Sequence, residues 1–124
     1  MKIEIKYELP IFSQSLEKDP IVRTKDMDME IELLGTDEKD KLRTIILKFS
    51  AVLCNKYTSA RFIPRLYDSY DRLVELVDSE WLEELKVMNE RDFSYWNPKH
   101  YVIYLDEIGM FQFIAWEYEV IDGE

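Results

Sequence analysis

Nucleophilic catalysis is the first chemistry to consider, because the chain has one cysteine, Cys54, and one histidine, His100. A catalytic thiol needs an adjacent base, and His100 is the only histidine that could serve Cys54. Cys54 ends an apolar segment, where a buried and unreactive thiol is the usual case. The serines lie in no Gly-x-Ser-x-Gly setting. The sequence therefore predicts no catalytic residue.

Metal and nucleotide sites are also disfavoured by the residue types. One cysteine and one histidine cannot supply the ligands of a structural zinc site. Asp37, Glu38 and Asp40 form the closest group of carboxylates, but they lack the spacing and central glycine of a calcium loop. With three glycines in 124 residues, no phosphate-binding loop can be written. We expect no metal and no cofactor.

A row of acidic residues is the first candidate binding surface. Four acidic residues alternate with four apolar ones: Asp26, Asp28, Glu30 and Glu32 with Met27, Met29, Ile31 and Leu33. Strand periodicity places the four carboxylates on one face, about 7 Å apart. Lys2 and Lys6 would neutralise half of the row if the first strand lay alongside it. Otherwise the row is a docking surface for a basic protein.

Tyr95 and Trp96, in the aromatic segment 93–98, are the second candidate. Tyrosine and tryptophan on a rigid loop are favoured anchors of protein interfaces. The alternative is that this segment forms a lid over the sheet. We favour the lid, because most large aromatic side chains are substantially buried.

A third candidate is a concave aromatic face that would bind a small ligand or serve an unknown enzyme. The residues that would build it are Tyr101, Tyr104, Phe111, Phe113 and Trp116, with His100 as a polar group. Ligand pockets are mostly apolar with a few polar groups, which this set matches. Packing against a helix is the simpler use of the same residues, and the sequence leaves core and pocket as alternatives.

Strands must position most of these residues. Alternation or β-branched runs predict strands at 2–9, 26–33, 44–53, 100–105 and 110–121. Residues 58–77 fit either a helical stripe or a strand, and we expect a strand at 72–77. Residues 11–25 are predicted to form a loop, and 106–109 a hairpin turn in which Gly109 takes a positive φ. The return strand should lie under a helix in its first half and face water in its second.

One helix is predicted over residues 79–90. Asp78 and Ser79 are good N-caps, and acidic residues follow them in the first turn. Its buried stripe is expected to comprise Trp81, Leu82, Leu85 and Met88. The chain is thus predicted to be a single α+β domain, residues 1–124. Its sheet should be mostly antiparallel, with about five or six strands and at least one packed helix.

Composition limits the partners. The 26 acidic and 16 basic residues give a net charge of −10, which disfavours nucleic acids and anionic membranes. No stretch is apolar enough for a membrane helix, and the first residues lack the apolar run of a signal peptide. A single cysteine suits a reducing compartment. We expect a cytoplasmic protein that would attract a basic partner.

The carboxyl-terminal half resembles a group of small uncharacterised bacterial proteins. The resemblance lies in Tyr70-Asp71-x-Leu73-Val74-Glu75-Leu76, Ser79-x-Trp81-Leu82, His100-Tyr101-x-Ile103-Tyr104 and Gly109-x-Phe111-x-Phe113-Ile114-Ala115. Some of these proteins are similar to immunity proteins encoded beside polymorphic toxins. The resemblance implies a protein that neutralises a toxin by binding it, and it transfers no catalytic residue.

Three functions are therefore compatible with the sequence. The first is an acidic protein-binding module that neutralises a basic partner, in the manner of an immunity protein. The second is a small-ligand-binding protein or unknown enzyme that uses the aromatic face. The third is a domain that self-associates as a homodimer, through a sheet edge or the apolar face around Trp116 and Tyr118.

Overall fold

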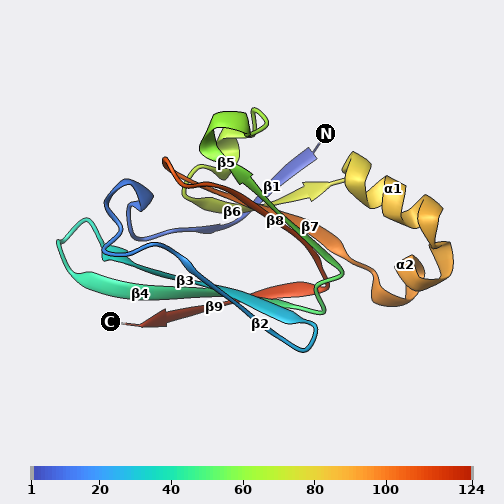
Figure 1. Cartoon of the computed structure of the whole chain (residues 1–124), viewed down its shortest axis with the longest axis horizontal. Helices are drawn as coiled ribbons and strands as arrows, with labels where there is room; N and C mark the ends of the chain where they lie inside the picture. The colour runs from blue at the N-terminus through green and yellow to red at the C-terminus, as the bar shows by residue number, and fades with distance from the viewer. Residues whose placement is uncertain (1, 124) are drawn as a thin grey trace.

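A computed structural model describes residues 2–123, which form nine strands and two α-helices. The strands are β1 (Lys2–Glu8), β2 (Ile21–Lys25), β3 (Asp28–Thr36), β4 (Leu42–Ser50), β5 (Cys54–Ser59), β6 (Arg72–Val77), β7 (Lys99–Leu105), β8 (Gly109–Ala115) and β9 (Glu117–Gly123). The helices are α1 (Glu80–Met88) and α2 (Glu90–Trp96). Two antiparallel sheets have the orders β1-β6-β7-β8-β5 and β2-β3-β4-β9. They lie face to face, with both helices at one end (Figure 1).

The α+β class and the antiparallel pairing are confirmed, but the strands are divided between two sheets. The predicted return strand 110–121 is in fact two strands, β8 in the five-stranded sheet and β9 in the four-stranded one. The chain changes sheet at Trp116, whose backbone N–H donates to the Ser50 carbonyl at 2.9 Å. One face of β8 is therefore buried by the opposite sheet, through Phe113 and Ala115. On its other face, Met110 lies in a second cluster that includes Ile63 and Leu66. β9 alternates exposed and half-buried residues, as predicted for the second half.

The main core lies between the two sheets. Its fully buried side chains include Ile31, Leu33, Ile45, Leu47 and Phe49 from the four-stranded sheet, and Tyr101, Ile103, Leu105 and Phe113 from the five-stranded one. These residues recur at every second position of their strands, which is why alternation in the sequence identifies the buried faces. Part of the outer face of the five-stranded sheet is covered by residues 60–69, whose Ile63 and Leu66 pack against the cluster of Val74, Leu76, Val102 and Met110.

Two strands were missed from the sequence. β2 lies within the predicted loop 11–25 and pairs with β3, and β5 pairs with β8. Both are edge strands, mostly exposed, so neither carries a clear apolar alternation. The strand predicted at 72–77 is confirmed as β6, and short 3-10 turns rather than a helical stripe precede it.

The predicted helix begins as expected, because Ser79 is its N-cap and its hydroxyl accepts from the Leu82 N–H at 3.2 Å. Trp81, Leu82 and Leu85 are half-buried. Met88 was expected in the same stripe but is exposed, because α1 extends away from the body of the sandwich (Figure 1). Gly109 has φ 145°, as predicted for the hairpin, and a side chain there would clash with the Thr58 carbonyl.

Candidate functional site

Cys54 and His100 do not form a dyad. Both lie opposite Ile114, on the two strands that flank β8, so they are two strand spacings apart, about 10 Å. Burial raises the pKa of the Cys54 thiol, which keeps it protonated. The pair therefore offers no activated nucleophile.

His100 is instead a structural link between the sheet and α1. Its Nε2 lies 2.8 Å from Gln112 Oε1, which can only accept, so Nε2 carries the proton. Its Nδ1 lies 2.8 Å from the Ser79 hydroxyl and accepts from it. Burial lowers the pKa of His100, and the nearby Lys56 charge acts in the same direction. The imidazole is therefore neutral and fixes the position of the α1 N-terminus.

The acidic row is only partly a row. Asp26 lies in the turn between β2 and β3 with φ 56°, outside the strand. Asp28 accepts from the Ala51 N–H at 3.0 Å. Glu30 pairs with Arg23 at 3.3 Å, and Glu32 pairs with Lys18 at 2.8 Å and Arg23 at 3.1 Å. These partners lower the pKa of Glu32, with Lys18 the larger cause.

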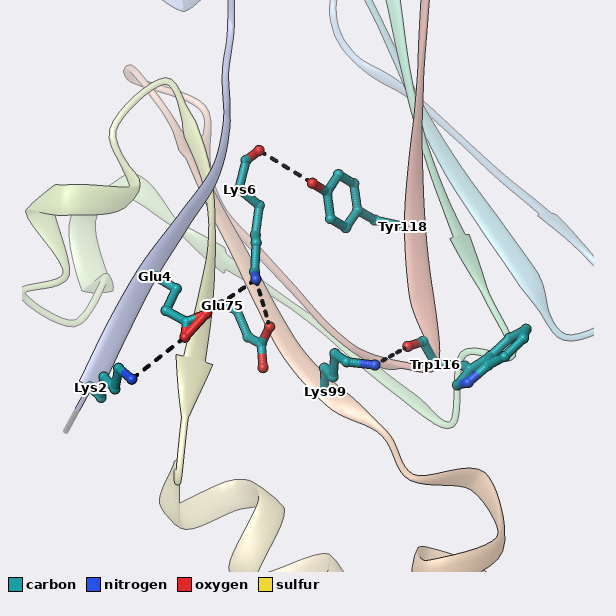
Figure 2. A network of polar contacts seen from close by, with 7 residues as sticks. All are labelled: Lys2, Glu4, Lys6, Glu75, Lys99, Trp116 and Tyr118. Carbon is teal, nitrogen blue, oxygen red and sulfur yellow. Dashed lines mark hydrogen bonds and ion pairs between the residues drawn. The ribbon is translucent and has the colours of Figure 1, made fainter.

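Lys2 and Lys6 do not neutralise this row, because β1 belongs to the other sheet. Lys6 Nζ lies 3.2 Å from Glu4 and 3.4 Å from Glu75, and Lys2 lies 3.8 Å from Glu4 (Figure 2). Lys6 also links the two layers, since its carbonyl accepts from the Tyr118 hydroxyl at 3.2 Å (Figure 2). The basic residues beside the acidic row come from β2 and the loop before it, which sequence periodicity does not identify as a neighbour.

The acidic row should therefore behave as a structural feature. The double variant Asp28→Lys/Glu30→Lys removes the Ala51 contact and places new positive charge beside Arg23. We expect the free energy of unfolding to fall by about 1–2 kcal/mol, measured by urea denaturation. The control Asp19→Lys/Glu38→Lys makes the same charge change at two exposed loop positions. An equal loss in both variants would contradict the pairing.

The predicted aromatic face does not exist as a single surface. Tyr101 and Phe113 point into the core between the sheets, where both are buried against Phe49. Tyr104 lies on the opposite face of the sheet, in the smaller cluster under residues 60–69. Trp116 is half-exposed at the crossing between sheets. The second sheet fills the space that a ligand would need.

Tyr95 and Trp96 lie on α2, not on a loop that covers the sheet. Tyr95 is 78% exposed, Trp96 is half-buried, and their rings contact edge-to-face at 5.1 Å. The lid prediction is therefore wrong, because α2 packs on α1 beyond the end of the sandwich (Figure 1). The side chain of Asn89 caps α2 by accepting from the Asp92 N–H at 3.2 Å.

The two helices form an arm, residues 78–96, that is both acidic and apolar. Six acidic and two basic residues give the arm a net charge of −4. Neither helix contains a fully buried residue. Val87 and Met88 are 80% and 78% exposed, in addition to Tyr95. Sequence periodicity detects α1 but cannot show that its far end leaves the body of the protein.

One face of α1 gathers these features. Glu80, Glu83, Glu84 and Val87 follow the i, i+3, i+4, i+7 spacing and together line a shallow depression of about 430 Å³. The three carboxylates thus lie on the same helix face as the exposed Val87 side chain.

A second depression lies at the base of the arm. It has a volume of about 600 Å³ and is lined by Lys56, Leu76, Asp78, Ser79, Glu80, Trp81, Glu84 and His100. Its floor is the neutral Ser79–His100 pair, and its wall is the half-buried indole of Trp81. The Lys56 ammonium lies over this indole, 4.7 Å from the ring centroid. We call this depression the Trp81 pocket.

The chain matches no known family model, no curated protein and no solved structure. Within residues 2–123, no helix is long and apolar enough to cross a membrane. The same residues contain no group of three or more histidine, cysteine, aspartate or glutamate side chains arranged to hold a metal ion.

Proposed function

We propose that the protein is a binding module that uses its arm to dock onto a basic partner protein. The observation that carries this proposal is the exposure of Val87, Met88 and Tyr95 on an arm whose net charge is −4. Protein interfaces typically place apolar anchor residues at the centre and polar or charged residues around them. The acidic charge supports a basic partner, because complementary potentials accelerate encounter.

The arm supports docking better than the acidic row does. Glu30 and Glu32 already have basic partners, whereas the three glutamates of α1 form no ion pair within residues 2–123. A partner's lysine or arginine would therefore gain a new interaction at the arm rather than compete for an existing one. Neutralisation of a basic toxin, in the manner of an immunity protein, is the form of this function that we propose to test first.

The proposal predicts that the arm determines affinity. The partner should be sought among the products of adjacent genes, purified, and titrated against the wild type by surface plasmon resonance. The variant Val87→Ser/Tyr95→Ser removes two exposed anchors without touching the core, and it should weaken binding at least about tenfold. Glu83→Lys should mainly slow association, with an effect that shrinks as salt rises.

A matched control exists outside the arm. Phe62 and Tyr67 are 81% and 68% exposed, on the turns between β5 and β6, so Phe62→Ser/Tyr67→Ser removes similar apolar area away from the arm. This control should bind as the wild type does. Equal weakening by the two double variants, or a partner that binds the arm variant normally, would overturn the proposal. Sedimentation of the free protein distinguishes the alternative of self-association, because a homodimer would form without any partner.

A further inference from the structure

We propose that the Trp81 pocket binds the guanidinium group of an arginine side chain from the basic partner. This inference rests on the proposed function for the source of the arginine, but the chemistry of the pocket can be tested alone. The pocket adjoins the arm face directly, because Glu80 and Glu84 line both depressions. A partner seated on α1 would therefore extend side chains over it.

The first observation is that the indole face already holds a cation. Lys56 Nζ lies 4.7 Å from the Trp81 ring centroid, within the range of a cation–π interaction. Lys56 is exposed and comes from the edge strand β5, so its side chain is free to leave. A guanidinium would replace it well, since this planar group is less strongly hydrated than an ammonium and stacks on aromatic rings. Lys56 thus occupies in the free protein the place of the partner's arginine.

The second observation is the charge around this ring. The pocket is lined by three acidic residues, Asp78, Glu80 and Glu84, and by one basic residue, Lys56. Among residues 2–123, no basic nitrogen lies within ion-pair distance of these three carboxylates. A guanidinium has five N–H donors, so it can stack on the indole and still donate to a carboxylate at the rim. Lys56 alone leaves these acceptors unmatched.

The third observation is the floor of the pocket. His100 and Ser79 are both buried and satisfy each other, with Nδ1 accepting from the hydroxyl at 2.8 Å. The imidazole is neutral, so the floor adds no positive charge that would repel an entering cation. Ser79 also caps α1, which holds Glu80 and Trp81 in fixed positions at the mouth.

The test uses ethylguanidinium chloride as the probe and needs no partner protein. The indole N–H resonance of Trp81 is followed in ¹H–¹⁵N spectra during titration, with sodium chloride at the same ionic strength as the reference. We expect ethylguanidinium to shift the Trp81 indole resonance in a saturable way, which sodium chloride does not. Methylammonium should bind more weakly than ethylguanidinium. Lys56→Met removes the competing ammonium and should tighten ethylguanidinium binding about two- to fivefold.

Two further variants make the result specific. Lys86→Met makes the same charge change on the same helix outside the pocket, and it should leave the affinity unchanged. Trp81→Leu should abolish saturable binding, followed through the amide resonances of Glu80 and Glu84. Equal affinities of the Lys56→Met and Lys86→Met variants for ethylguanidinium would overturn the proposed guanidinium site. Binding of methylammonium as tightly as ethylguanidinium would overturn it as well. The titration contains no partner protein, so a negative result would leave the proposed docking through the arm intact. Conversely, failure to find a partner would leave the measured binding of ethylguanidinium intact.

Discussion

Phe49→Ala is expected to lower the free energy of unfolding by about 3–5 kcal/mol, because it removes a whole aromatic ring from the core. Phe49 is fully buried at the centre of the sandwich. Its ring stacks on Phe113 of the opposite sheet, with centroids 4.1 Å apart and an angle of 14° between the planes. Tyr101 packs on it as well, at 5.7 Å. Truncation would leave a cavity between two sheets that cannot close on it.

Urea denaturation followed by circular dichroism measures this loss. Phe62→Ala is the matched control, because it deletes the same atoms from a side chain that is 81% exposed. The control should change the free energy of unfolding by no more than about 0.5 kcal/mol. A loss below about 1 kcal/mol in Phe49→Ala would contradict the packing of the two sheets through this residue.

Alternation in the sequence predicts which side of a strand is buried, but not what buries it. Ile31 and Leu33 are in the core as expected, because a period of two places them on one face. The second sheet escaped prediction since residues 110–121 are apolar enough to suggest one continuous strand. The change of sheet at Trp116 depends on a long-range backbone contact with Ser50, which no local pattern encodes.

The candidate sites show the same limit. Asp28, Glu30 and Glu32 share one face of β3 as predicted, whereas Asp26 lies in the preceding turn. The basic neighbour Arg23 comes from β2, a short edge strand without a clear pattern. Tyr95 was a candidate anchor, but the sequence favoured a lid, because its exposure follows only from the position of α2 beyond the sandwich (Figure 1). The Trp81 pocket joins β5, β7 and α1, which are distant in sequence, so no local pattern could assemble it.

Acid should destabilise the protein through His100. Burial lowers the pKa of His100 in the folded state. Below about pH 6.5, His100 is therefore protonated in the unfolded chain while it is still neutral in the folded protein. The stabilisation is therefore fully present above the unfolded pKa and is lost as pH falls toward the folded pKa. We expect His100 to reduce the free energy of unfolding by up to about 1.4 kcal/mol for each pH unit in this window.

His100→Gln isolates this contribution, because the chain has no second histidine. The variant loses the Ser79 and Gln112 contacts and should be less stable at neutral pH, yet its stability should decline less between about pH 7 and pH 5. The carboxylates titrate in both proteins, so the difference between the two pH profiles belongs to His100. Parallel profiles would show that the imidazole takes up its proton equally in both states. Burial would then not lower the pKa of His100, and the imidazole in the floor of the Trp81 pocket would not be kept neutral by burial.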